Sequence, residues 1–253
     1  MICDLQKASM WKRISAFLFD LILLSIAGVL SAWLLSAATG YDGYRKRLNN
    51  RYDHYGAEYG VDMHMSLNQY DSLTPEEQTL LETAYDALAA DAEAVRAYSM
   101  TIQLTILITS LGLLAGYLIT EFAVPLALKD GRTLGKRIFG LAVMRSDGVR
   151  ISPVLLFVRT VLGKYALETM IPVFIVMMMF WGNLGIVGLA VLILIPVLEI
   201  IVMIRTPGNS MIHDLVSHTT VVDYASQMIF DSSEAMIAYK ERMHAQEHAR
   251  GPY

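Results

Sequence analysis

Three acidic residues interrupt long apolar stretches of the sequence, and their position makes them the first candidates for chemistry. Asp20, Glu121 and Glu199 are each the only ionised residue of a run, and the runs cover 14–39, 101–128 and 184–204. An ionised carboxylate inside a bilayer is costly, so it must face protein or water and be paired or protonated. Each acid lies a similar number of residues from the predicted cytoplasmic end of its run. We therefore expect all three at one depth, in the cytoplasmic half of the membrane.

Such a set of carboxylates has two interpretations. Arg13 lies seven residues before Asp20, which is nearly two helical turns, so both residues share one helix face about 10 Å apart along the axis. In the first interpretation the acids form a cation or proton site at an inner vestibule, with Arg13 and Asp214 at its gate. In the second they form ion pairs with Arg13, Arg159 or Lys164 that fix the packing of the helices. The sequence leaves both interpretations open.

Other patterns that could support catalysis or metal binding each lack a necessary part. The His-Asp pair at 213–214 has no nucleophile beside it, and the H-x-x-E-H pattern at 244–248 lies in a polar tail without a third ligand. The glycine-rich segment 131–136 does not have phosphate-loop spacing, and Arg137 stands where Ser or Thr would bind magnesium. We therefore expect no catalytic residue, no metal, no cofactor, no enzymatic activity and no binding of nucleic acid.

The composition indicates a membrane protein. Of the 253 residues, 55% are hydrophobic and 17% are charged, whereas about a quarter are charged in a soluble domain. A helix needs about 20 apolar residues to cross the hydrocarbon core. The three runs have this length, and a fourth at 167–181 has it if the helix begins near Lys164. The first run is longer than the apolar region of a secretory signal and contains an acid, so we expect an uncleaved membrane helix.

The distribution of basic residues predicts how the helices are oriented. The segment 41–98 has five basic and eleven acidic residues, whereas 129–164 has eight basic and two acidic ones. Because Lys and Arg are retained on the cytoplasmic side, we expect a multi-pass protein of the bacterial inner membrane with both termini in the cytoplasm. The segment 41–98 then lies outside, and an outer turn at 181–183 joins the last two helices.

The segment 41–98 has the local signals of a helical hairpin. Thr74 and Pro75 with Glu77 three residues after the threonine are typical of a helix start. Aromatic and aliphatic residues at helical spacing before Gly56 or Gly60 indicate an earlier helix.

The inner segment has the signals of a small β element and a surface helix. The short apolar stretches 137–144 and 219–223 are typical of strands, and 146–148 is a turn signal. Pro153 opens a helix that is flanked by Arg159 and Lys164, so we place this helix in the membrane interface.

The predicted fold is an all-α membrane protein with four transmembrane helices, an extracytoplasmic helical hairpin and a small cytoplasmic β element. Its parts are a transmembrane domain (10–40 and 99–223), an extracytoplasmic insertion (41–98) and a polar cytoplasmic tail (224–253). Four basic residues of the inner segment are expected to contact anionic lipid headgroups at the cytoplasmic face of the bilayer: Arg132, Lys136, Arg137 and Arg159. Four helices enclose only a small vestibule, which favours a homodimer.

Three segments together carry a resemblance to a known family. They are Arg13 and Asp20 with six residues between them, GRTLGKRIFGLAVMRSDGVRISPVLLFVR at 131–159, and HDLVSHTTVVD at 213–223. In this order they resemble the RDD family of bacterial membrane proteins, which is named for an arginine and two aspartates. The resemblance covers about 10–39 and 100–223, and it implies that Asp214 is the second aspartate. The residues 216–218, where small side chains usually follow His-Asp-Leu, depart from the pattern.

The resemblance implies transport only in general terms, with sodium–proton antiport attributed to some similar proteins. We therefore expect transport of a small solute or cation, with cation/proton exchange as one form, carried by Asp20, Glu121 and Glu199. The small ligand is unknown. The alternative is a membrane scaffold or sensor that does not transport and that binds a partner through 41–98.

Overall fold

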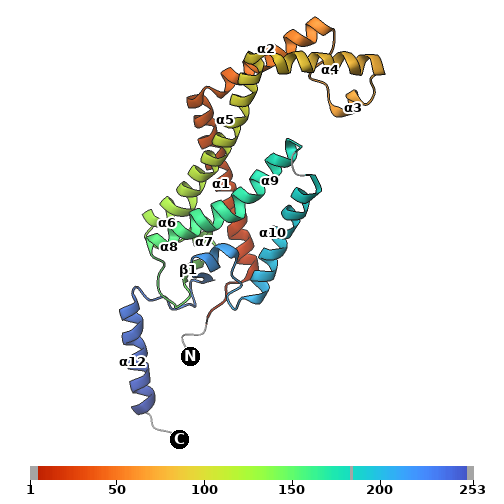
Figure 1. Cartoon of the computed structure of the whole chain (residues 1–253). Helices are drawn as coiled ribbons and strands as arrows, with labels where there is room; N and C mark the ends of the chain where they lie inside the picture. Colours follow the sequence, from red (N-terminus) through yellow and green to blue (C-terminus); the bar gives the residue numbers. More distant parts are fainter. Residues whose placement is uncertain (1–4, 183–184, 250–253) are drawn as a thin grey trace. The chain divides into compact units, whose positions relative to one another are not determined.

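The computed structural model describes residues 5–182 and 185–249, which are mostly helical (Figure 1). Within these residues, four helical stretches have the length and composition to cross a membrane: 10–39, 92–127, 153–180 and 185–205. The prediction of four apolar helices is confirmed. Trp181 and Gly182 lie in a turn after the third stretch, whereas Asn183 of the predicted outer turn lies outside the described residues.

The chain forms two compact units. Unit 1 comprises Met1–Val29 and Leu113–Tyr253, and unit 2 comprises Leu30–Gly112. Helices α1 (Met10–Thr39) and α5 (Ala92–Tyr117) contribute residues to both units. Each unit is described by itself below.

Unit 2 contains the predicted hairpin. Its helices after α1 are α2 (Tyr41–Tyr59), α3 (Leu67–Tyr70) and α4 (Pro75–Ala90), and α2 packs against α4. Thr74 Oγ1 accepts a hydrogen bond from the Glu77 N–H, and the Glu77 carboxylate accepts one from the Thr74 N–H, so the predicted capping box begins α4. Gly60 ends α2 in the left-handed region at φ 70°. The hairpin is confirmed, while its extracytoplasmic location stays a prediction.

Glycines allow α1 and α5 to approach closely. In unit 2 a Cβ built on Gly112 would lie 2.9 Å from Ala32 Cβ, and in unit 1 one on Gly116 would lie 3.1 Å from Gly28 Cα. Both distances are too short for a larger residue without movement of the neighbour. Small residues at this spacing therefore bring the two membrane helices together.

In unit 1 the second apolar stretch changes its winding near an acid. The helix α5 continues as the π-helix η1 (Leu118–Ala123) and then as α6 (Val124–Ala127). Pro125 has no N–H, so the carbonyl of Glu121 lacks its usual helical partner. Thr160 Oγ1 donates a hydrogen bond to this carbonyl over 3.1 Å. The proline and Thr160 together account for the irregular helix that presents Glu121.

The helix that begins at Pro153 is not the interfacial helix predicted from the sequence. Helix α8 (Pro153–Phe157), the π-helix η2 (Val158–Met170) and α9 (Ile171–Phe180) form one continuous helical stretch of 28 residues. Arg159 is 2% exposed and therefore does not flank a surface helix. Helix α10 (Gly185–Arg205) packs against α9, beside which it lies in Figure 1.

A two-stranded sheet completes unit 1. Strands β1 (Leu141–Arg145) and β2 (Thr219–Asp223) pair antiparallel, with Val143 opposite Val221. Residues 137 and 138, predicted as the start of the first strand, belong instead to the short helix α7 (Leu134–Ile138), because Thr133 caps this helix. A second short helix, α11 (Ile212–Val216), precedes β2, and α12 (Ser233–Ala249) lies in the polar tail.

Candidate functional site

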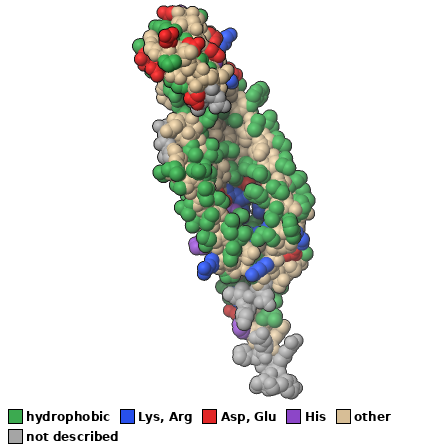
Figure 2. Space-filling model, turned by 90° about the vertical axis from the view of Figure 1, so that its right-hand side faces the viewer, with side chains coloured by type: hydrophobic (Ala, Val, Ile, Leu, Met, Phe, Trp, Pro, Cys, Tyr) green, Lys and Arg blue, Asp and Glu red, His purple; other side chains and the backbone are tan. Residues whose placement is uncertain are grey.

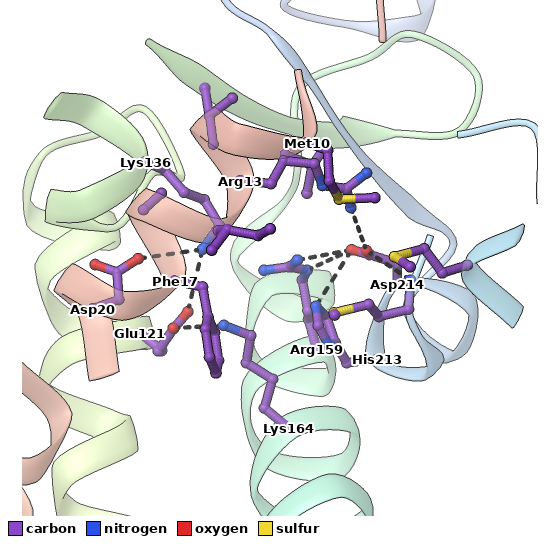
Figure 3. Close-up of a pocket in the computed structure, with 16 residues that line it drawn as sticks. Met10, Arg13, Phe17, Asp20, Glu121, Lys136, Arg159, Lys164, His213 and Asp214 are labelled. Atoms are coloured by element: carbon purple, nitrogen blue, oxygen red, sulfur yellow. Dashed lines mark hydrogen bonds and ion pairs between the residues drawn. The ribbon is translucent and has the colours of Figure 1, made fainter. Parts of the chain in front are cut away.

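Unit 1 contains a cavity of about 290 Å³ that collects most of the predicted site residues (Figure 3). Eight of its sixteen lining residues are apolar, and the polar ones are Arg13, Asp20, Glu121, Lys136, Arg159, Lys164, His213 and Asp214. Figure 3 shows them in two groups, with Asp20, Glu121, Lys136 and Lys164 in one and Arg13, Arg159, His213 and Asp214 in the other. Residues distant in sequence thus form one polar interior.

Asp20 attaches the glycine-rich segment to α1. Its carboxylate accepts hydrogen bonds from Thr133 Oγ1 at 2.5 Å and from the Gly135 N–H at 2.7 Å. The Lys136 ammonium lies 3.8 Å away. Asp20 is 7% exposed, so all of these interactions are shielded from solvent. The carboxylate satisfies N–H and O–H donors at the start of α7, and these contacts favour the packing interpretation for this acid.

Glu121 is held by two lysines from different segments. Lys164 Nζ lies 2.5 Å from one carboxylate oxygen and Lys136 Nζ lies 3.7 Å from the other. Lys136 therefore stands between Asp20 and Glu121. Burial lowers the pKa of the Lys136 ammonium to about 8, even though Glu121 favours its charged form.

Asp214 is the centre of the second group. Nε and Nη2 of Arg159 donate to Asp214 Oδ1 over 3.1 and 2.7 Å, and both side chains are almost completely buried. Nη2 of Arg13 lies 3.9 Å from the other carboxylate oxygen. Burial by itself would raise the pKa of Asp214, but the Arg159 guanidinium and the Met211 N–H hold the pKa of this carboxyl well below its ordinary value. Arg159 is therefore the closer partner of Asp214, and Arg13 is the more distant one.

Glu199 lies apart from the other two predicted carboxylates. Its Oε2 accepts a hydrogen bond from the Ile212 N–H over 3.2 Å, whereas its Oε1 is buried without a hydrogen-bond partner within the described residues. Glu168 of η2 accepts from the backbone N–H of His213 and contacts Nδ1 of the imidazole at 2.8 Å. Burial lowers the pKa of the His213 imidazole well below its ordinary value.

Three of the four basic residues predicted at the membrane face are buried. Arg132, Lys136 and Arg159 are 8%, 8% and 2% exposed. Arg132 is held by Asp130, whereas Arg137 has a side chain that is 49% exposed. Of these four, Arg137 is therefore the one whose head can readily reach a lipid headgroup.

Sequence reasoning missed several members of the site. Lys136 was assigned to the surface, although it is the basic partner of Asp20. Glu168 received no role because it stands at the edge of an apolar run. The available signal was the position of Glu168 four residues after Lys164, since side chains at this spacing lie on one face of a helix. Within the described ranges, no group of three or more His, Cys, Asp or Glu residues could hold a metal ion.

Four apolar helices, together with a cavity lined by paired basic and acidic side chains, define a multi-pass integral membrane protein. Residues 7–218 match the RDD family, so the chain belongs to this family. This confirms the resemblance carried by Arg13, Asp20 and the two later motifs. Neither the curated proteins nor the solved structures include a match.

Proposed function

We propose that the protein transports a small charged solute across the membrane and that the cavity of unit 1 is its binding site. The observation that carries this proposal is that seven charged side chains from distant segments line a volume of about 290 Å³. Ionisable residues inside a membrane protein commonly mark a solute pathway, and the volume is close to that of small-molecule pockets. The lining has four basic and three acidic members. Because each acid already has a basic partner, the excess positive charge favours a solute with a negative group over a bare cation.

Glu199 supports a proton-linked form of this transport. Its Oε1 is buried without a hydrogen-bond partner within the described residues, and buried carboxyl groups of membrane proteins commonly carry protons. His213 lines the cavity and follows Ile212, whose N–H donates to Glu199. A solute that displaces His213 would therefore change the surroundings of the Glu199 carboxyl group, as exchange of a solute or cation against a proton requires.

Proton-linked transport is tested in proteoliposomes with a trapped pH-sensitive dye. Sodium chloride, potassium chloride or sodium acetate should each be added to the outside of the vesicles. The proton flux that follows should be lost in Glu199→Gln. Glu241→Gln in the exposed tail helix is the matched control. Asp20→Asn keeps an acceptor for the Gly135 N–H but removes the charge, so an unchanged flux would exclude Asp20 from the mechanism. Absence of any solute-dependent flux in the wild-type protein would contradict the proposal.

For orientation, we propose an inner-membrane protein with both termini in the cytoplasm, because basic residues are concentrated in 129–164. The test uses a Cys3→Ser background, which removes the one cysteine of the chain. A membrane-impermeant maleimide should label Asp71→Cys in intact cells and Glu241→Cys only after permeabilisation. The reverse labelling would show the opposite orientation.

A second candidate function is binding of a partner protein through unit 2, and one observation favours it. A cavity of about 240 Å³ in this unit is lined by three tyrosines, Tyr52, Tyr85 and Tyr98, with aliphatic residues between them. Tyrosines that combine an apolar ring with a polar tip are enriched at protein interfaces. A photo-crosslinking amino acid at position 98 should capture a protein in cells, whereas one at the exposed position 71 should not. Equal labelling at both positions would remove this candidate.

A further inference from the structure

The cavity of unit 1 opens among exposed apolar side chains. Ile14 and Phe17 of α1 line the cavity and are 41% and 57% exposed. Met203 of α10 lines it as well. Within the described residues, α10 packs against α9 and has no extended contact with α1. Figure 2 shows the result, a hollow with basic side chains inside it and hydrophobic side chains around it. With α1 and α10 crossing the bilayer, as their length and composition allow, access to the cavity is lateral.

The cavity lining has one more basic than acidic side chain, and Arg13 is the basic residue that carries this excess charge. Lys136 and Lys164 contact Glu121, and Arg159 contacts Asp214. Within the described part of the chain, the Arg13 guanidinium donates one hydrogen bond, to the Gly208 carbonyl over 3.1 Å. Its distance to Asp214 is 3.9 Å. A guanidinium has five N–H donors, so most of the donors of Arg13 remain available to a ligand.

Arg13 also stands next to the apolar side of the opening. It lies one helical turn before Phe17 and next to Ile14 on α1, and all three residues line the cavity. A ligand that binds here meets a basic group and an apolar surface at the same place. This combination matches an amphipathic molecule with an anionic head.

We propose that the cavity binds the anionic headgroup of a membrane phospholipid through Arg13, with the acyl chains leaving past Ile14 and Phe17 into the bilayer. This inference rests on the proposed function, since it names the class of charged molecule that the cavity takes. The head supplies a phosphate, which a guanidinium binds through charge-assisted and often bidentate hydrogen bonds. The half-apolar lining and the lateral opening favour a lipid over free phosphate or glycerol phosphate.

The test is binding of phosphatidylglycerol to the purified full chain in neutral detergent, measured by native mass spectrometry. Wild-type protein should bind phosphatidylglycerol more tightly than phosphatidylcholine. Arg13→Gln should weaken the binding of phosphatidylglycerol at least about tenfold, or about 1.4 kcal/mol, and Arg13→Lys should retain part of it. The matched control is Lys12→Gln, because Lys12 is the adjacent basic residue and does not line the cavity. Equal affinity of wild type and Arg13→Gln, or no preference for phosphatidylglycerol, would overturn the inference.

Two further arms identify the source of the anion. Glycerol 3-phosphate should compete poorly, and competition as strong as that of the lipid would show that a free anion is the ligand, which overturns the inference and leaves the transport proposal standing. A photo-crosslinking amino acid at position 17 should give a lipid adduct. A covalent dimer instead would show that a second copy of the chain covers the opening. Selective lipid binding without solute flux would contradict the transport proposal and support this inference.

Discussion

The carboxylate of Asp20 accepts a hydrogen bond from the backbone N–H of Gly135, 2.7 Å away in the interior of unit 1. This contact joins a membrane helix to the start of α7, 115 residues later in the chain. The lone acid of the first apolar run is therefore tolerated because the segment after the second run supplies its donors. Gly135 is the residue that allows the approach, since a Cβ there would collide with the Ala16 carbonyl.

The first prediction concerns this close approach. Gly135→Ala should lower the free energy of unfolding by about 1–3 kcal/mol, because the added methyl group forces α7 away from α1. Unfolding in mixed detergent micelles with increasing dodecyl sulfate, followed by circular dichroism, measures the change. Gly43→Ala is the control, since a Cβ at Gly43 meets nothing within 4 Å and alanine favours helix by up to about 1 kcal/mol. Equal stability of both variants would show that the contact is loose.

The second prediction concerns the buried pair of Arg159 and Asp214. Asp214→Asn should destabilise the protein by about 3–5 kcal/mol, because it leaves the buried guanidinium without its closest carboxylate. Asp231→Asn should cost less than about 1 kcal/mol, because the pair of Asp231 and Arg150 is exposed. In a double-mutant cycle, Arg159→Met combined with Asp214→Asn should cost less than the sum of the single changes. Additive costs would show that the two residues do not stabilise each other.

The third prediction is a pH dependence of stability that comes from Lys136. Its pKa is about 8 in the folded protein and 10.5 ordinarily. Below about pH 8 the Lys136 ammonium is protonated in both the folded and the unfolded chain. The folded state then bears the whole free-energy cost of burying this charge. Between about pH 8 and 10.5 the folded chain releases the proton and the unfolded chain keeps it, so this contribution to stability rises with pH.

The groups that face Lys136 are Glu121 and Asp20, which favour its charge, and Lys164 and Arg159, which oppose it. Lys136→Met removes the titration while the other groups remain. Thermal unfolding between about pH 7.5 and 9.5 should therefore show a rise in wild type relative to Lys136→Met. Parallel profiles of the two proteins would contradict the assignment.

The fourth prediction concerns the capping box of unit 2. Thr74→Ala should destabilise α4 by about 1 kcal/mol, because the Glu77 N–H loses its acceptor. Hydrogen exchange of the amides in 75–90 should become faster. Thr79→Ala is the control, because the Thr79 hydroxyl donates only to the Pro75 carbonyl of its own helix. Unchanged hydrogen exchange in Thr74→Ala would mean that the stability of α4 depends only on its packing against α2.

Several features follow from the sequence because their causes are local. Hydrocarbon thickness requires a fixed length of apolar helix, so the apolar runs locate membrane helices without any knowledge of their neighbours. The cap at Thr74 and the helix end at Gly60 depend on residues within one turn. The RDD motifs are likewise visible as a pattern along the chain, and the match over 7–218 confirms them.

The partners of the buried charges were decided by tertiary structure. From the sequence, Arg159 and Lys164 place the helix after Pro153 in the membrane interface, and Glu168 follows them in the same stretch. The structure compensates each of them from another segment, with Asp214, Glu121 and His213 as the respective partners. A hydropathy scale assigns each charged residue the full free-energy cost of leaving water. An oppositely charged partner from a distant part of the sequence removes much of that cost in the folded protein.

The same reason separates the three predicted carboxylates. The sequence places Asp20, Glu121 and Glu199 at similar depths, which is a statement about position along each helix. Which of them meet depends on how the helices rotate and pack, and the structure brings Asp20 and Glu121 to one lysine while Glu199 accepts from the Ile212 N–H. The sequence alone thus determined that buried charges must exist in this membrane protein. Only the folded chain decided their partners, because side chains that lie far apart in the sequence, such as Lys164 and Glu121, meet only when whole helices pack.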